Sequence, residues 1–209
     1  MRTAVLDRLW IYECLAQLFD ADLGHLPEPA DAAASSPLVS AAVALRTAVV
    51  RSSAEDILAD HARLFVNARD GVAAPPYASW YLDGQLLGPS SRFVEHVYSE
   101  QGLEPAADAG EPADYVGVEL EFLLFLTRHE LAASSTGDDD ALASVLDLER
   151  TFMLNHLARW VPAFVAQIRA AEPGPVFAAA GDLLGAVVQD EARHLSRGGS
   201  KAIARQRGE

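Results

Sequence analysis

Apolar residues recur along most of this chain at spacings of three and four, which is the pattern of amphipathic helices. In the first such segment, residues 2–20, Leu6, Leu9 and Trp10 contribute to one wide apolar stripe. Further helices are predicted at about 38–51, 54–67, 89–101, from 138 onward with a kink or restart at Pro162, and 176–195. No stretch alternates persuasively between apolar and polar residues as a half-buried strand would. The predicted fold class is therefore all-α, a single-domain helical bundle.

The strongest helix signal lies in residues 111–126. Pro112 suits the first helical position, where its missing N–H is not needed, and the acidic residues on both sides of it suit the positive end of the helix dipole. The residues that follow are apolar around most of the circumference, interrupted only by Glu119 and Glu121. This pattern predicts a central, buried helix that carries an acidic and aromatic strip near its N-terminal end.

An aromatic segment comes before this helix. Tyr77, Trp80 and Tyr81 lie within five residues, directly after Pro75 and Pro76, where the helical pattern is broken. The segment is predicted to be a loop. Its side chains could plug the core or form the wall of a groove for a peptide, and on general grounds core packing is favoured, because aromatic residues dominate core burial as well as interfaces.

The charge of the chain is strongly acidic and unevenly distributed. The formal net charge is −14 over 209 residues, half of which are hydrophobic. Four basic side chains against one carboxylate give residues 196–209 a charge of +3, so residues 1–195 carry −17. We expect one helical domain over 1–195 and a basic, disordered tail over 196–209. The acidity argues against a nucleic-acid partner and favours solubility or a basic partner.

The only cysteine, Cys14, excludes an intramolecular disulfide framework and a cysteine-based zinc site, which favours a reducing compartment. Asp7 and Glu13 interrupt the first apolar segment, so it does not form the core of a signal peptide, and no later apolar run approaches the length of a membrane span. The expected location is the cytoplasm, without stable membrane insertion.

Catalytic signatures are sparse. Glu191 and His194 form one Glu-x-x-His pair, whereas a di-iron bundle needs two such pairs and two further glutamates, so a solvated helix end is favoured over a metal ligand. The sequence contains no Walker loop, nucleophile elbow or dinucleotide fingerprint, and most of its histidines are dispersed on separate helical segments. We therefore expect no catalytic residue, metal or cofactor. The alternative is a helical-bundle enzyme, such as a weak nucleotide hydrolase or a metal-dependent protein.

A series of short motifs extends in order from about Leu58 to Trp160. The motifs are His61-Ala-Arg-Leu-Phe65, Pro76-Tyr77-Ala-Ser79-Trp80-Tyr81, Gly88-Pro89, Tyr98 with Gly102-Leu103, Glu111-Pro112-Ala113-Asp114-Tyr115 with Glu119-Leu120 and Phe122-Leu123, and His156-Leu157 with Trp160. Each motif is unspecific by itself, but their order resembles the TorD/DmsD/NarJ family of chaperones for molybdenum-containing oxidoreductases, the redox enzyme maturation proteins.

The resemblance implies an all-helical cytoplasmic chaperone without enzymatic activity. Its partner would be the catalytic subunit of a molybdopterin oxidoreductase. The chaperone would bind the leader of this subunit until the cofactor is inserted, and in the exported branches this leader is a twin-arginine signal peptide. In the NarJ branch the client stays on the cytoplasmic side. The resemblance also makes domain swapping conceivable, and we expect a monomer with a minor domain-swapped dimer.

The family's peptide site is associated with a Glu-Pro-x-Asp-His motif and the aromatic loop before it. The residues nominated for peptide binding are Tyr77, Ser79, Trp80, Tyr81, Glu111, Pro112, Asp114, Tyr115 and, on the same strip of the predicted helix, Glu119. Tyr115 stands where the family commonly has histidine. A tyrosine stays neutral at the pH values where histidine titrates, so we expect Tyr115 to supply a ring face and a hydroxyl without a pH switch.

Overall fold

The computed structural model describes residues 5–23, 37–66, 71–104 and 110–206. The helices are α1 (Val5–Phe19), α2 (Pro37–Arg51), α3 (Ala54–His61), α4 (Ala78–Asp83), α5 (Pro89–Glu100), α6 (Val116–Thr136), α7 (Asp139–Phe152), α8 (Ala158–Ala170) and α9 (Pro175–Gln206), with π-helical turns at Ala62–Val66 and Met153–Leu157. Within these ranges the structure contains no strand, and the all-α prediction is confirmed.

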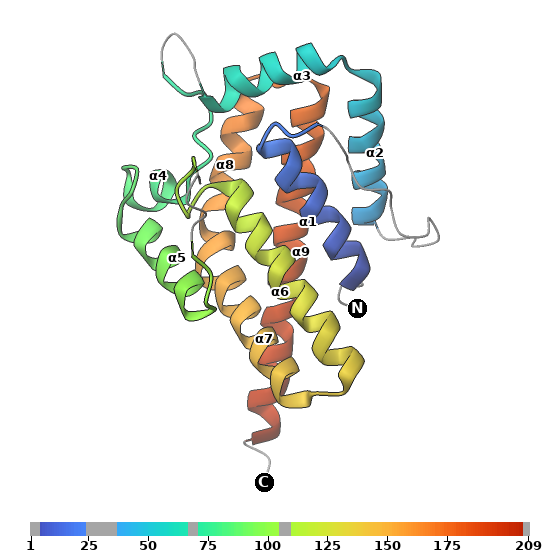
Figure 1. The fold of residues 1–209 in the computed structure, drawn as a ribbon, viewed down its shortest axis with the longest axis vertical. Helices are drawn as coiled ribbons and strands as arrows, with labels where there is room; N and C mark the ends of the chain where they lie inside the picture. Colours follow the sequence, from blue (N-terminus) through green and yellow to red (C-terminus); the bar gives the residue numbers. More distant parts are fainter. Residues whose placement is uncertain (1–4, 24–36, 67–70, 105–109, 207–209) are drawn as a thin grey trace.

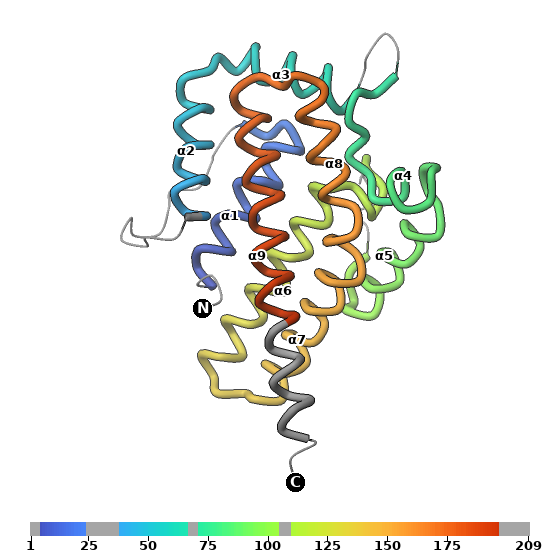
Figure 2. The backbone as a smooth tube through the Cα atoms, turned by 180° about the vertical axis from the view of Figure 1, so that it is seen from behind, coloured from blue at the N-terminus to red at the C-terminus, as the bar shows by residue number. Residues whose placement is uncertain are grey.

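The helices form a bundle around α6 and α9 (Figure 1). The helix α6 packs against α1 and α7, whereas α9 packs against α2 and α8. Seen from behind, α9 runs along the length of the molecule between α2 and α8 (Figure 2). The short helices α4 and α5 contact each other and form an edge of the bundle, where α4 also contacts α8. This edge lies beside the N-terminal half of α6 and carries the aromatic segment.

Several helix boundaries follow from the local sequence. The hydroxyl of Ser53 accepts the Asp56 N–H at 3.0 Å at the start of α3, and the carboxylate of Asp138 accepts the Ala141 N–H at 2.9 Å at the start of α7. These are N-cap bonds, which satisfy backbone donors that have no partner inside the helix. The helix α6 ends at Gly137, whose φ of 70° is the left-handed conformation that glycine adopts without strain.

Four boundaries differ from the prediction. The central helix begins at Val116, so Glu111, Pro112 and Asp114 lie in the segment before it. The aromatic segment contains the short helix α4 and is not simply a loop. The helix from residue 138 is interrupted at Met153–Leu157, before Pro162, which lies inside α8. The last helix extends beyond residue 195. The side chains after residue 196 lie outside the described part of the structure, so the disorder expected for the basic tail stays a prediction.

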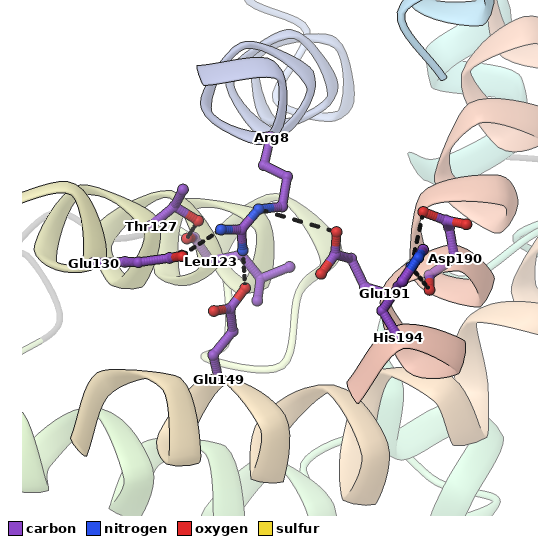
Figure 3. A network of polar contacts seen from close by, with 8 residues as sticks. All are labelled: Arg8, Leu123, Thr127, Glu130, Glu149, Asp190, Glu191 and His194. Carbon is purple, nitrogen blue, oxygen red and sulfur yellow. Dashed lines mark hydrogen bonds and ion pairs between the residues drawn. The ribbon is translucent and has the colours of Figure 1, made fainter. Parts of the chain in front are cut away.

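A buried polar network ties four helices together (Figure 3). The guanidinium of Arg8, on α1, forms ion pairs with Glu130 of α6 and Glu149 of α7, and its Nε lies 4.0 Å from Glu191 of α9. Glu191 is completely buried, so the prediction that it belongs to a solvated helix end is wrong. It was wrong because Arg8, 183 positions away in the chain, supplies a countercharge that the local sequence does not reveal.

The described residues contain no group of three or more His, Cys, Asp or Glu side chains arranged to hold a metal ion. None of the helices in these ranges combines the length and the apolarity needed to cross a membrane.

Candidate functional site

The aromatic segment and the segment before α6 are joined directly. Tyr77 and Tyr115 form an isolated antiparallel bridge, in which the Val116 N–H donates to the Pro76 carbonyl at 2.9 Å and the Ala78 N–H donates to the Asp114 carbonyl at 3.0 Å. The structure therefore brings together the two stretches that the sequence nominated, residues 77–81 and 111–119, although Tyr77 and Tyr115 are 38 positions apart in the chain.

Asp114 holds the start of α4. Its side chain is fully buried, and Oδ2 accepts the Ser79 N–H at 2.8 Å. Ser79 is the second residue of α4, and Tyr77, at the N-cap position, makes no side-chain capping bond. Asp114 thus acts as the cap from a distant segment, since a helix start leaves backbone donors that need acceptors. Asp114 and Ser79 both lie beneath the surface and support the site from inside.

Tyr115 connects α6 to α1. Its hydroxyl donates to the carbonyl of Phe19, the last residue of α1, and the Nε2–H of His61 donates to the same oxygen at 2.7 Å. Burial, followed by the nearby Asp20 carboxylate, raises the pKa of Tyr115 above its ordinary value, so the hydroxyl remains a donor. Because this hydroxyl has an intramolecular partner, the hydrogen bond to a peptide that we expected of it would require a rearrangement.

Glu119 and Tyr81 anchor the site to α8. Glu119 is fully buried, with Oε1 2.6 Å from His156 Nε2 and Oε2 accepting the Trp160 Nε1–H at 3.1 Å. Burial raises the pKa of this carboxyl, although the contact with His156 acts in the opposite direction. Tyr81 stacks on Trp160 at a ring-centroid distance of 5.7 Å and donates its hydroxyl to Gln167. Both residues therefore hold α4 and α6 in place and do not face solvent freely.

Two of the nominated residues, Glu111 and Trp80, are exposed. Glu111 is exposed and accepts the Tyr77 hydroxyl at 2.8 Å, while Trp80 is 42% exposed on the outer side of α4. Burial and the bond to Glu111 raise the pKa of Tyr77 above its ordinary value, so this hydroxyl also remains a donor. Pro112 is half-buried beside Glu111.

Glu111 and Pro112 form one end of a groove between α5 and α6, with a volume of about 530 Å³. Four carboxylates line it, and apolar side chains from both helices and the connecting segments complete the lining. The lining residues are Glu95, Tyr98, Leu103, Glu104, Glu111, Pro112, Ala113, Val118, Glu121, Phe122 and Phe125. All four carboxylates belong to exposed residues, whereas Tyr98 and Phe122 are buried, so the groove has an acidic rim and an apolar floor.

Most residues of this groove were not nominated from the sequence. Both Glu121 and Phe125 belong to the central helix; the charge of Glu121 was one signal of an outward position, whereas Phe125 lies in an unbroken apolar run and gave none. Glu95 and Glu104 gave no signal, because only the packing of α5 beside α6 places them opposite Glu111. Of the nominated residues, Glu111 and Pro112 line the groove, Tyr77 contacts Glu111, and the others support the walls or lie outside.

Comparisons with known proteins agree with the fold and with the resemblance. Residues 31–166 match the family described as nitrate reductase delta subunit. The chain is 31% identical over 203 residues to the chaperone protein TorD of Escherichia coli strain ATCC 8739, covering 90% of this chain and 94% of that protein. It is 28% identical over 137 residues to TorD of Vibrio cholerae serotype O1 strain ATCC 39315, and this match spans only 60% of the relative's length.

A solved structure of a redox enzyme maturation protein from Archaeoglobus fulgidus is similar with a TM-score of 0.53. The alignment covers 90% of this chain and 96% of that one, at 18% sequence identity. At this identity the similarity shows the fold alone.

Proposed function

We propose a function from the premise that this chain belongs to the TorD/NarJ family of molybdoenzyme chaperones. The chain binds the leader peptide of a molybdopterin-containing oxidoreductase, and the binding site is the groove between α5 and α6. The leader is of the twin-arginine type, and the chaperone retains it in the cytoplasm while the client receives its cofactor. The chain acts by binding and is not an enzyme. It works predominantly as a monomer.

The observation that carries this proposal is the combination of an acidic rim and an apolar floor in one groove. A twin-arginine leader presents two guanidinium groups next to an apolar stretch, so its chemistry complements both parts. Arginine can bind a carboxylate through two parallel hydrogen bonds, which orients the peptide as well as attracting it. The apolar floor adds hydrophobic stabilisation, which depends on the apolar area of the peptide that is buried and not on the exact residues of the peptide.

The dimensions of the groove limit how much of a leader it can hold. The floor on α6 extends from Val118 to Phe125, and the seven steps between these residues make about 10 Å of helix axis at about 1.5 Å per residue. An extended peptide spans about 3.3 Å per residue, so this length corresponds to about three residues. The groove therefore suits the arginine pair and the first apolar residue after it. The remainder of the leader lies outside.

The two walls have different roles in this proposal. Glu111 and Glu121 stand on the α6 side, and Glu95 and Glu104 on the α5 side, so an arginine side chain can meet a carboxylate from either wall. The bond of Asp114 to the Ser79 N–H ties the segment before α6 to α4, and the bond of Glu119 to Trp160 ties α6 to α8, so this wall is fixed. A fixed wall favours binding, because less conformational entropy is lost when the peptide arrives.

Titration calorimetry tests the proposal. The probe is a synthetic peptide with two adjacent arginines followed by eight leucine and alanine residues, and a second peptide carries glutamine in place of both arginines. The native chain should bind the first peptide more tightly. Each exposed carboxylate–arginine pair contributes about 0.2–1 kcal/mol, so a variant with Glu111→Gln and Glu121→Gln should lose roughly twofold to thirtyfold in affinity.

Asp147→Asn is the matched control, since it neutralises an exposed carboxylate on α7 outside the groove lining. Equal affinity of the groove variant, the control and the native chain would contradict the proposed site. Isolation from the native host gives a second test, because a chaperone should co-purify with an oxidoreductase precursor. Stoichiometric iron or manganese without such a client would favour the alternative of a helical-bundle enzyme.

A further inference from the structure

A row of aromatic rings continues the floor of the groove along α6. Tyr98 of α5 packs on Phe122 with 4.5 Å between the ring centroids, and Phe122 stacks on Phe125 at 6.1 Å with an angle of 12° between the ring planes. The next ring is that of His129, whose centroid lies 4.1 Å from that of Phe125. Phe122 and Phe125 line the groove, whereas His129 lies one helical turn beyond the lining. The ring surface on α6 is therefore longer than the groove.

The ring of His129 is exposed, yet its orientation is fixed. Nδ1 lies 2.9 Å from the carbonyl oxygen of Phe125, and because a carbonyl only accepts, Nδ1 carries the hydrogen. This bond holds the imidazole against the partly buried ring of Phe125. Positions 118, 122, 125, 129 and 132 follow one another at spacings of four and three, so they share one face of α6. We call this face the outer stripe.

The exposed carboxylates next to the outer stripe are confined to one end of α6. Glu111, just before the helix, and Glu121 are both exposed and line the groove. In the rest of α6, residues 122–136, the only carboxylate is Glu130, which is buried and pairs with Arg8. The C-terminal half of α6 therefore offers a guanidinium no exposed carboxylate of its own, although it offers apolar and neutral side chains.

The other charges near this face point in the same direction. Glu95 and Glu104 belong to the opposite wall of the groove, and the lining on α6 ends at Phe125. The charged neighbour of His129 along the helix is the guanidinium of Arg128, which is exposed and lies 3.9 Å from Glu13. A cationic side chain of a ligand is thus attracted inside the groove and repelled beyond it.

We propose, resting on the function proposed above, that the leader lies along the outer stripe in the same direction as α6. Its arginine pair occupies the end with Glu111 and Glu121, and the apolar residues that follow pass over Phe125 onto the ring of His129. His129 is then a further residue of the binding surface. Because the arginines precede the apolar stretch in such a leader, this placement determines which way the peptide chain runs.

The lengths agree with this arrangement. Four steps separate Phe125 from His129, which is about 6 Å of helix axis at about 1.5 Å per residue. An extended peptide advances about 3.3 Å per residue, so about two residues cover this distance. The groove holds the arginine pair and the first apolar residue, so the second and third apolar residues reach His129. They bury apolar surface there against the exposed face of its ring.

Distances between spin labels test the direction of the bound peptide. One nitroxide is attached at Gly110→Cys, before α6, or at Ala132→Cys, in its C-terminal half. Both positions are exposed, and position 110 has open space for a side chain. Because Cys14 is buried, the native chain is the unlabelled control. The second nitroxide is attached to either end of the Arg-Arg peptide used in the calorimetric test.

Double electron–electron resonance should find the N-terminal label of the peptide nearer position 110 and its C-terminal label nearer position 132. The reverse order would overturn the inference and leave the groove as the binding site. Equal distances from both peptide ends to each position would also overturn it, because the peptide would then have no fixed direction. Absence of binding by the folded native chain would instead refute the proposed function, and this inference with it.

Replacement of His129 gives an independent test by calorimetry. The two probes are peptides with two arginines followed by one leucine or by five. His129→Ala should lower the affinity for the longer peptide about twofold to tenfold and leave that for the shorter peptide unchanged. His129→Phe keeps a ring at this position and should retain the native affinity for both.

His96→Ala is the matched control, since it removes an exposed histidine of α5 that lies outside the groove lining. Both peptides should bind this variant as tightly as they bind the native chain. If His129→Ala weakens both peptides equally, or weakens neither, the ring of His129 is not part of the binding surface.

Discussion

Asp114→Asn, compared with Glu111→Gln, tests which residues support the fold of the site and which contact the peptide. The native carboxylate is fully buried and accepts the Ser79 N–H at 2.8 Å, and its other oxygen has no hydrogen-bond partner. An asparagine retains the shape but replaces a charged acceptor with a neutral one. It also places an amide NH₂ in a buried position where the oxygen it replaces has no hydrogen-bond partner.

Two contributions determine the expected loss of stability. A hydrogen bond to a charged group contributes about 1.5–3 kcal/mol and a neutral one about 0.5–1.5 kcal/mol, so the exchange costs about 1 kcal/mol. A buried amide donor without a partner costs about 1–3 kcal/mol more. We expect Asp114→Asn to lower the free energy of unfolding by about 2–4 kcal/mol, which for a domain of this size lowers Tm by roughly 4–16 °C.

Urea unfolding followed by circular dichroism measures the effect, with Glu111→Gln as the matched control. Glu111 is exposed and accepts only the Tyr77 hydroxyl at 2.8 Å, so its replacement should change stability by less than about 0.5 kcal/mol. Peptide affinity should show the opposite order, falling for Glu111→Gln and changing little for folded Asp114→Asn. If Asp114→Asn unfolds within about 0.5 kcal/mol of the native chain, its carboxylate is not the cap of α4.

Three further predictions concern the buried frame of the site. Glu119→Gln should lower the free energy of unfolding by about 2–4 kcal/mol in urea, because the carboxylate is fully buried between His156 and Trp160; a neutral result would show that neither bond matters. Gly117→Ala should lower the free energy of unfolding by about 1–3 kcal/mol and shift the end of α1, because the new Cβ would overlap the Asp20 carboxylate and the Tyr115 ring. Hydrogen exchange at residues 19–23 would detect this shift, and unchanged protection of these amides would contradict it. Tyr115→Phe should lower the free energy of unfolding by about 1 kcal/mol, because the hydrogen bond to the Phe19 carbonyl is lost. Peptide affinity measured by calorimetry should not change. A loss of affinity without a loss of stability would instead show that the hydroxyl binds the peptide.

The chain outside the site shows how local signals succeed. The start of α7 after Asp138, the start of α5 at Pro89 and the start of α3 at Ala54 were all predicted, and the structure confirms them. Each depends on residues within one turn of the boundary, because capping and proline geometry act through neighbouring backbone groups. The start of α6 was placed too early, since Pro112 and its acidic neighbours look like a first turn. Instead, Ala113 and Asp114 form a turn, and Tyr115 is extended where it pairs with Tyr77, so the helix begins only after it.

Whether an individual carboxylate is buried or exposed could not be predicted from such local signals. Glu119 and Glu121 are two positions apart on one helix, yet Glu119 is fully buried against His156 whereas Glu121 stands at the rim of the groove. Glu191 pairs with Arg8 from the other end of the chain. Helical propensity is the same for an exposed and a buried glutamate, so only the partner that packs against it distinguishes the two cases.

The sequence by itself determined the all-helical class, most helix boundaries and the family resemblance, because periodicity, capping and motif order are local properties; it also nominated two stretches that the Tyr77–Tyr115 bridge brings together. The tertiary structure alone decided which nominated residues face outward. Burial and countercharges come from segments far apart in the chain. Glu95 of α5 and Glu104 just after it lie across the groove from Glu111, and the π-helical turn at Met153–Leu157 and α8 supply His156 and Trp160, the partners of Glu119. The groove exists only after α5 and α6 pack side by side, so its acidic rim belongs to the fold and to neither helix separately.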